Sequence, residues 1–257
     1  MKKNYLILIV IFFFAAHSYA QSLGTYDYER TKQIAFREDN NFCIYDYEQS
    51  SDPLKTGTYS LKTIHNCDFL YLECENEGSK KFMCLHNEEM IVLYSEKDLE
   101  PCLIGYSSNN LAETVTFIEN KEINASSFLI EGKKAYKPEN ITKLTLESPW
   151  VESVKGNGEN EYIEIDNWTS LNFIFFNGYV SYSKPYLYSY NSRPKTLEIE
   201  ELTTGKKINV ALKDTPNPQM VKCDLDSRIE GKIRITIKDV YSGKKYSDTC
   251  LNCIMER

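Results

Sequence analysis

Histidine is scarce in this sequence: the 257 residues include three, and one of these lies among the first 20. Only His65 and His86 therefore remain as candidates for a general base or a histidine metal ligand. The G-x-S-x-G, H-E-x-x-H, P-loop and G-x-G-x-x-G motifs are also absent. The chain is accordingly predicted to have no enzymatic activity. Glycoside hydrolysis by a pair of carboxylates stays open as an alternative, because acidic residues are plentiful.

The sequence also lacks an excess of basic residues. Its 30 Lys and Arg stand against 37 Asp and Glu, which gives a formal net charge of −7. Because nucleic acid binding needs a basic face to neutralise phosphates, nucleic acid is excluded as a partner. Apolar residues make up 42% of the chain, an ordinary share for a globular protein, which argues against a disordered or collagen-like chain.

Long hydrophobic runs are missing after position 20. The apolar run at 6–16 has 11 residues, too few to span a bilayer, which takes about 20. It follows Lys2 and Lys3 and precedes Ser18-Tyr19-Ala20, so residues 1–20 are predicted to be a cleaved signal peptide of bacterial type. An uncleaved N-terminal anchor is the alternative. The mature chain is expected to be secreted or periplasmic, with no transmembrane segment.

Export would place eight cysteines in an oxidising compartment, where an even number predicts disulfides. Cys74 and Cys84 flank a turn-like segment at 75–80 and could face each other across a hairpin. Cys250-Leu-Asn-Cys253 has the spacing of redox and zinc sites, but no second CxxC and no histidine completes a zinc set. Redox and metal roles remain alternatives to structural disulfides. The candidates are Cys43, Cys67, Cys74, Cys84, Cys102, Cys223, Cys250 and Cys253.

Short apolar runs rich in Tyr, Ile, Val and Phe recur along the chain and predict an all-β protein. In the first half they lie at 42–47, 57–64, 69–74, 82–86 and 90–94, with polar breaks between them. We expect residues 21–106 to form a small disulfide-linked antiparallel β domain, a meander or barrel. Residues 107–122 are the expected linker.

Residues 123–257 also have a β pattern. The predicted strands are at 161–165, 171–176, 196–201, 207–212, 232–237 and 249–255. The run at 171–176 is almost continuously apolar, as expected in the middle of a sandwich, whereas 232–237 alternates and should have one wet face. The long connections, rich in Asn, Tyr, Pro and Gly, predict a β-sandwich with elaborate loops.

One of these loops is a candidate ligand-binding surface. Five tyrosines fall within twelve residues and are followed by two polar residues: Tyr179, Tyr182, Tyr186, Tyr188 and Tyr190, then Asn191 and Arg193. Tyrosine provides a rigid ring with a hydroxyl, and Asn and Arg provide donors in fixed geometry, which suits a sugar or a peptide. The alternative is a set of rings that cover the sandwich, with Arg193 in a structural ion pair.

Six ordered blocks in the second half resemble a known family. They are Trp150-Val-Glu152, Gly156-Asn-Gly158 with Glu161-Tyr-Ile163, Asn177-Gly-Tyr179, Asn191-Ser-Arg193-Pro-Lys195, Leu212-Lys-Asp214, and the run from Ile235 to Cys250 that contains Asp239, Tyr241, Gly243 and Asp248. They are similar to the glycan-binding, translocation-type domain of secreted bacterial NAD glycohydrolase toxins, which has a discoidin-like (coagulation-factor type C) galactose-binding fold. The resemblance covers about 123–257. It implies a jelly-roll β-sandwich without the toxins' NAD-cleaving domain.

The resemblance adds further candidate ligand-binding residues to the tyrosine-rich loop. The full set is Tyr179, Tyr182, Tyr186, Tyr188, Asn191, Arg193, Trp150, Glu152, Asp239 and Tyr241. Trp150 in such sandwiches is more typically a core residue, and Asp239, Tyr241 and Asp248 could instead tie the last loop together by hydrogen bonds.

Departures from the family pattern concern Ca²⁺. The Asp-Gly pair that usually precedes the Trp is replaced by Lys137-Pro-Glu-Asn-Ile-Thr142, and a Ser-Glu pair near the C-terminus by Leu251-Asn-Cys253. Ca²⁺ sites need several oxygen ligands, for which Glu139, Asn140 and Glu256 are weak replacements. No cofactor is therefore predicted.

The sequence predicts an exported, non-catalytic binding protein of two β domains that recognises a glycan or glycoconjugate through loops of its C-terminal domain. A module that docks a protein partner and binds no sugar is the main alternative. An exported hydrolase is a further one.

Overall fold

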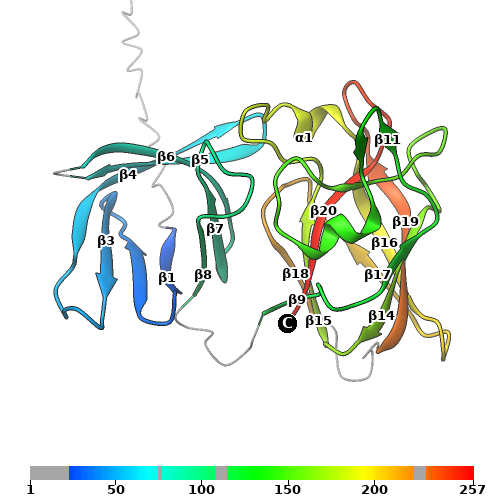
Figure 1. Ribbon diagram of the computed structural model, residues 1–257, viewed down its shortest axis with the longest axis horizontal. Helices are drawn as coiled ribbons and strands as arrows, with labels where there is room; N and C mark the ends of the chain where they lie inside the picture. The colour runs from blue at the N-terminus through cyan, green and yellow to red at the C-terminus, as the bar shows by residue number, and fades with distance from the viewer. Residues whose placement is uncertain (1–22, 75–76, 108–114, 223–229) are drawn as a thin grey trace, which may run out of the picture.

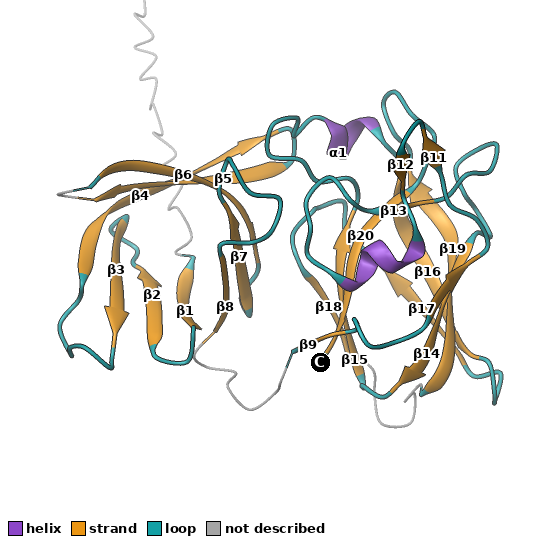
Figure 2. Ribbon diagram, viewed as in Figure 1, coloured by secondary structure: helices purple, strands orange, loops and turns teal. Residues whose placement is uncertain are grey.

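The computed structural model describes residues 23–74, 77–107, 115–222 and 230–257. The predicted signal peptide, Cys223 and part of the predicted linker lie outside these residues. The described chain is almost entirely β, as predicted, and is arranged as two domains side by side (Figures 1 and 2). No helix in these ranges is both long enough and apolar enough to cross a membrane.

The N-terminal domain is a closed antiparallel barrel of eight strands in chain order. These are β1 (Gly24–Tyr28), β2 (Lys32–Phe36), β3 (Asn41–Asp46), β4 (Lys55–Ile64), β5 (Cys67–Cys74), β6 (Gly78–His86), β7 (Met90–Tyr94) and β8 (Leu103–Ser107). Pairing of Asp27 in β1 with Tyr106 in β8 closes the barrel. Closure removes the exposed strand edges that a small sheet would otherwise present.

A tight turn joins the two long strands β4 and β5. Ile64 pairs with Cys67, so the turn consists of His65 and Asn66 alone. Both residues have positive φ, 51° and 70°, as two-residue hairpin turns of the primed type require. In Figure 1 the tip of this hairpin (cyan) extends from the barrel toward the second domain.

The C-terminal domain is a β-sandwich. One sheet has the order β10 (Ile123–Ala125), β14 (Tyr162–Trp168), β19 (Gly231–Tyr241), β16 (Arg193–Glu201) and β17 (Lys207–Ala211). The other has the order β13 (Trp150–Val151), β20 (Cys250–Glu256), β15 (Asn172–Asn177) and β18 (Gln219–Lys222). The remaining elements are β9 (Thr116–Phe117), which pairs with β20, the hairpin β11 (Ile130–Glu131) and β12 (Lys134–Ala135), the 3-10 helix η2 (Pro138–Thr142) and α1 (Leu187–Tyr190). Because β9 lies within the expected linker, the sandwich begins earlier in the chain than position 123.

The sandwich core lies between its two sheets. Its aromatic centre is Trp168, which stacks on Phe173 with 4.2 Å between ring centroids, and Phe173 stacks in turn on Phe175. Alternate residues of β19, such as Ile233 and Ile235, contribute to the same core, as their period-2 pattern predicts.

A second apolar core joins the two domains. The barrel contributes Cys67, Phe69, Met83, Leu85, Met90, Val92 and Tyr94, and the sandwich contributes Leu144, Leu146, Ile174, Phe176, Val180, Tyr182, Tyr188, Cys253 and Met255. All five residues of β7 are buried, because one face of this strand lines the barrel and the other packs on the sandwich. The two domains thus share buried surface and form one packed unit.

The predicted disulfides are absent among the seven described cysteines, all of which are free thiols. Cys74 pairs with Gly78 and Cys84 with Asp68, so the two lie at opposite ends of the β5–β6 hairpin. Cys250 and Cys253 lie on β20 on either side of a register shift in its pairing with β15, and they belong to different apolar clusters. The sequence prediction was wrong here because cysteine number and spacing do not reveal strand register or facing.

Candidate ligand-binding surface

Much of the predicted tyrosine-rich site is internal structure. Arg193 is 5% exposed and forms two hydrogen bonds with the Asp214 carboxylate, from Nε to Oδ1 (3.0 Å) and from Nη2 to Oδ2 (2.7 Å). The hydroxyl of the fully buried Tyr188 donates to the same Oδ1, 3.1 Å away. The guanidinium lies over the Tyr188 ring, and Tyr241 donates to the Leu212 carbonyl. Arg193 therefore forms a structural ion pair with Asp214, as expected under the alternative to a ligand-binding role.

Trp150 and Glu152 are buried beneath the loops. The Trp150 indole donates to the Ser127 carbonyl at 2.9 Å. The Glu152 carboxylate accepts hydrogen bonds from the backbone N–H groups of Val154 (2.8 Å) and Thr249 (2.9 Å). Burial raises the pKa of Glu152 above its usual value, although these two N–H bonds oppose the shift. Both side chains hold loop backbone in place and face away from solvent.

Three other predicted residues are tied to nearby structure. Tyr179 lies edge-on to Tyr136 and donates to the Glu147 carbonyl. Asn191 caps α1 by donating to the Leu187 carbonyl. Asp239 forms an exposed ion pair with Lys195, at 2.6 Å.

Tyr182 belongs to the junction between the domains. Its ring packs against Phe69 of the barrel, and its hydroxyl donates to the Lys81 carbonyl at 3.3 Å. Of the ten predicted residues, Tyr186 is the one that remains as an aromatic platform outside these arrangements.

Three aromatic side chains gather at the loop end of the sandwich, and we call them the tyrosine ridge: Tyr186, Tyr190 and Tyr246. The rings of Tyr186 and Tyr190 are 5.0 Å apart and inclined at 52°. Tyr246 is 39% exposed. Lys245 Nζ lies 5.1 Å from the Tyr246 ring centroid and 5.9 Å from that of Tyr190, so the lysine bridges the two elements that carry the ridge.

The ridge is held by backbone hydrogen bonds between α1 and the β19–β20 loop, residues 242–249. Lys244 N donates to the Ser189 carbonyl, and the N–H groups of Lys245 and Tyr246 both donate to the Tyr190 carbonyl. Gly243 permits this approach, because a Cβ at that position would lie 2.6 Å from the carbonyl carbon of Asn191. The loop is thereby fixed against α1, and the ridge is preorganised.

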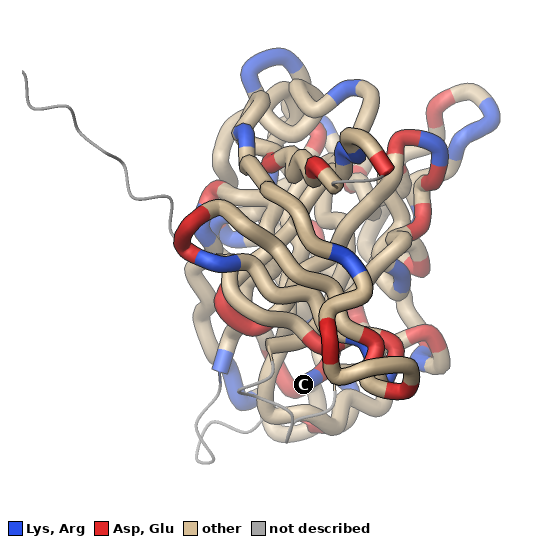
Figure 3. The backbone as a smooth tube through the Cα atoms, turned by 90° about the vertical axis from the view of Figure 1, so that its left-hand side faces the viewer, with Lys and Arg blue, Asp and Glu red and all other residues tan. Residues whose placement is uncertain are grey.

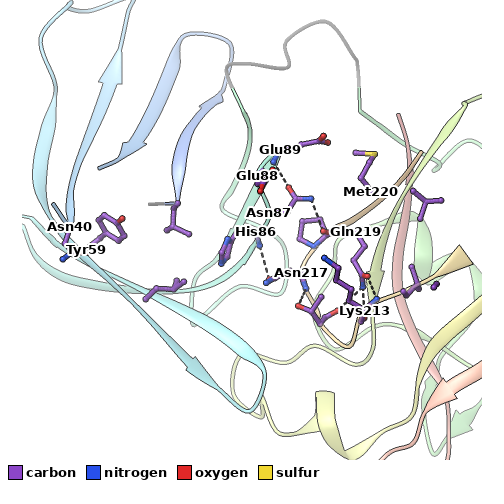
Figure 4. Close-up of a pocket in the computed structure, with 17 residues that line it drawn as sticks. Asn40, Tyr59, His86, Asn87, Glu88, Glu89, Lys213, Asn217, Gln219 and Met220 are labelled. Carbon is purple, nitrogen blue, oxygen red and sulfur yellow. Dashed lines mark hydrogen bonds between the residues drawn. The ribbon is translucent and has the colours of Figure 1, made fainter. Parts of the chain in front are cut away.

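A hollow of about 840 Å³ lies between the domains (Figure 4). Its polar groups mostly join the domains to each other: Asn217 accepts from the His86 backbone N–H at 3.1 Å, and Asn87 donates to the Pro218 carbonyl at 3.0 Å. Glu89 is paired with Arg257 and with Lys222. Since few of these groups are left for a ligand, we interpret the hollow as the seam between the domains.

An acidic side chain behind this seam has a shifted pKa. His86 Nε2 lies 3.3 Å from Asp68 Oδ2, and Thr63 donates to Asp68 Oδ1 at 2.6 Å. Burial acts to raise the pKa of Asp68, but the interactions with His86 and Thr63, together with a contact from Asn217, outweigh it and hold the pKa below its usual value. The carboxylate is thus stabilised in its charged form by both domains.

Two of the residues weighed as Ca²⁺ ligands have partners within the protein. Asn140 donates to the Pro149 carbonyl, and Glu256 pairs with Lys121 at 3.1 Å. Within the described ranges, no three His, Cys, Asp or Glu side chains gather closely enough to hold a metal ion.

Sequence reasoning missed Tyr246, Lys245 and Gly243 as parts of the surface. Lys244-Lys245 is most simply interpreted as a solvated turn, and Tyr190 counted only as one of five crowded tyrosines. The available signal was the glycine before Lys-Lys-Tyr, since a glycine that precedes exposed aromatic residues can mark close backbone packing.

Three solved structures are similar to this chain at low sequence identity. A domain of the Clostridium perfringens GH89 protein, CBM32-5, solved in complex with GalNAc-β-1,3-galactose, is 12% identical with a TM-score of 0.42, covering 55% of this chain and 98% of that one. The family 32 CBM of C. perfringens NanJ, solved with galactose, is 14% identical with a TM-score of 0.38, covering 56% and 98%. A two-domain protein of unknown function from Bacteroides fragilis is 12% identical with a TM-score of 0.36, covering 88% and 87%.

Curated protein sequences give no match to the chain. Residues 116–256 match the NAD glycohydrolase translocation F5/8 type C domain, which confirms the resemblance seen in the six sequence blocks and the discoidin-like fold of the sandwich. Because the match spans more than half of the chain, the protein belongs to this family of NAD glycohydrolase translocation F5/8 type C domains.

Proposed function

We propose that this protein is an exported, non-catalytic carbohydrate-binding protein, and that the tyrosine ridge of its discoidin-like domain is the sugar-binding platform. The observation that carries the proposal is the set of half-buried Tyr186 and Tyr190 with the exposed Tyr246, held by backbone bonds between α1 and the β19–β20 loop. Sugar rings have apolar C–H faces that pack on aromatic rings, while tyrosine hydroxyls can bond to sugar hydroxyls.

Preorganisation supports this role. The Gly243 contact and the bonds to the Ser189 and Tyr190 carbonyls fix the ridge before any ligand arrives, so binding need not order the loop. Shallow sugar sites typically have dissociation constants on the order of 0.1–1 mM. We therefore expect useful affinity only when several copies bind a multivalent surface.

The alternative of a protein-docking module has no better support than sugar binding. The tyrosine-rich segment does take part in a protein interface, through Tyr182, but that interface is between the two domains of the same chain. The ridge tyrosines lie at the edge of this junction, on the loops of the sandwich.

A multivalent glycan array tests the proposal. The protein is coupled to a multivalent carrier, and binding is compared with that of Tyr246→Ala and Tyr190→Ala variants whose folding is checked by circular dichroism. Tyr47→Ala is the matched control, because Tyr47 is also exposed, at 56%, but lies on the barrel. We expect a related set of sugars to bind the parent and the control and to lose binding to the ridge variants. A blank array from folded parent protein would refute the proposal.

A further inference from the structure

The barrel places one side chain beside the tyrosine ridge. His65 is exposed at the tip of the β4–β5 turn, and its ring lies edge-on to Tyr186, with 6.1 Å between centroids and 82° between planes. The ring presents N–H donor capacity at the rim of the sugar platform. The surface around the tyrosine ridge therefore contains residues of both domains.

The position of His65 is set by packing on both of its sides. Two residues further along the chain, the Cys67 thiol lies 3.8 Å from the Pro185 carbonyl, and Pro185 directly precedes Tyr186. Phe69 and Tyr182 pack together behind this contact within the shared core. The imidazole is consequently a fixed part of the surface, because the hairpin that carries it is packed against the segment that carries Tyr186.

The charge around the ridge is positive in a chain that is acidic overall. Lys184, Lys244 and Lys245 are exposed, and among the described residues none of them pairs with a carboxylate. Figure 3 shows the β19–β20 loop, topmost in the view, coloured as basic. The one acidic residue of this loop is Asp248, next to the buried Thr249 and Cys250.

We propose that His65 of the barrel and Lys245 of the sandwich form a composite subsite for the negative charge of an acidic sugar whose ring packs on the tyrosine ridge. The inference rests on the proposed function, because it assigns a ligand class to the same surface. A lysine with no carboxylate partner and an imidazole donor, both beside aromatic rings, match a sugar that carries a carboxylate or a sulfate, since charge-assisted hydrogen bonds to such groups are stronger than neutral ones. The barrel then acts as part of the receptor.

The test uses the full chain and three glycans built on one core: the neutral galactosylated form, its sialylated derivative and its sulfated derivative. We expect the parent protein to bind at least one anionic glycan about threefold to tenfold more tightly than the neutral one at low salt. The preference should shrink in 0.5 M NaCl (about 4 Å Debye length). The comparison of sialylated with sulfated glycan identifies the source of the charge.

Two pairs of variants separate the inference from the proposed function. Lys245→Ala and His65→Asn should each reduce the ratio of anionic to neutral affinity about threefold. Asn is chosen because it tolerates the positive φ of position 65. Lys245→Arg should retain the preference, and Lys133→Ala, an exposed lysine on the β11–β12 turn, should have no effect.

Equal affinity for neutral and anionic glycans would overturn the inference and leave the proposed function standing. If His65→Asn kept the full preference for anionic over neutral glycan, the barrel would not be part of the site, and the composite subsite would be refuted. Absence of sugar binding by the parent chain would overturn both the inference and the proposed function. Binding of the neutral glycan by Tyr246→Ala, compared with the parent, measures the contribution of the tyrosine ridge independently of charge.

Discussion

The ring of Tyr182 in the sandwich lies edge-on to the ring of Phe69 in the barrel, with 5.4 Å between centroids and 87° between planes. Phe69 is 1% exposed and Tyr182 is 9% exposed. The pair lies in the apolar core that contains residues of both domains, so each ring is buried partly by residues of the other domain. The barrel and the sandwich therefore stabilise one another.

Phe69→Ala should destabilise both domains together. Truncation of a buried Phe costs about 3–5 kcal/mol, and here the lost contacts include those with the sandwich. Both tryptophans, Trp150 and Trp168, are in the sandwich, so their fluorescence reports that domain alone. We expect Phe69→Ala in the barrel to lower the denaturant midpoint that tryptophan fluorescence reports, together with the midpoint from circular dichroism.

Tyr47→Ala, on the exposed surface of the barrel, should leave both midpoints unchanged. Independent domains would give a different result for Phe69→Ala: circular dichroism would show an additional early transition, and the tryptophan-reported transition would not move.

Asp214→Asn should destabilise the sandwich because it leaves the Arg193 guanidinium buried without its charge partner. Breaking a fully buried pair costs about 3–5 kcal/mol, and we expect about 2–3 kcal/mol because the Asp214 side chain is 35% exposed. Denaturant unfolding measures the difference. Asp239→Asn is the control, since its pair with Lys195 is exposed on both sides and should contribute little to stability. Similar costs for both variants would contradict the assignment of Arg193 as a buried structural residue.

Much of the fold could be predicted because strands have a local signature. The alternating run at 232–237 became the centre of β19, and the apolar run at 171–176 became β15, the strand between β18 and β20. The apolar run at 90–94 was identified as a strand, but the sequence could not show what would cover its second face. The second face is covered by sandwich residues such as Ile174 and Phe176, about 80 residues further along the chain.

The candidate site could be predicted less well because tyrosine has similar sequence signals in a core and on a surface. Tyr188 is buried and Tyr190 is half-buried although they are two residues apart in α1. The difference depends on Arg193 and Asp214, which cover one and not the other. Tyr246 joins the ridge through a contact over 50 residues of sequence, which no local pattern reveals.

Gly243→Ala should disturb the tyrosine ridge by displacing the β19–β20 loop from α1. The added Cβ would meet backbone atoms of Tyr190, Asn191 and Tyr246, which cannot move without breaking the bonds between α1 and the β19–β20 loop. Overpacking of this kind costs about 1–3 kcal/mol. We expect lower stability and weaker sugar binding, measured by thermal unfolding and by the array. Gly205→Ala tests a turn glycine that has no atoms near its Cβ position. Its positive φ makes alanine strained there as well, so lower stability is expected, but it should retain sugar binding. Full binding by Gly243→Ala would show that the ridge does not depend on this contact.

Asp68→Asn should flatten the acid limb of the stability profile. The folded-state pKa of Asp68 is lowered, so the unfolded chain takes up its proton first as the pH falls. The stabilisation is therefore fully present above about pH 4, the ordinary pKa range of Asp, and is lost as the pH falls toward the lower folded-state value. Denaturant midpoints measured from pH 7 to pH 2.5 should separate parent and variant at neutral pH and converge in acid. Parallel profiles would show that Asp68 does not contribute to acid sensitivity.

The cysteines should behave as thiols of unequal accessibility. Cys102 is exposed, whereas five others are buried: Cys43, Cys67, Cys84, Cys250 and Cys253. Burial raises the pKa of the Cys67 thiol to about 12, and that of Cys84 also rises, so neither forms the reactive thiolate at neutral pH. Iodoacetamide should modify Cys102 in the native protein and the buried set only after unfolding without reductant, as mass spectrometry of the peptides can show. Buried cysteines that stay unmodified in denaturant until a reductant is added would instead reveal disulfides, and would contradict the free thiols of the structure.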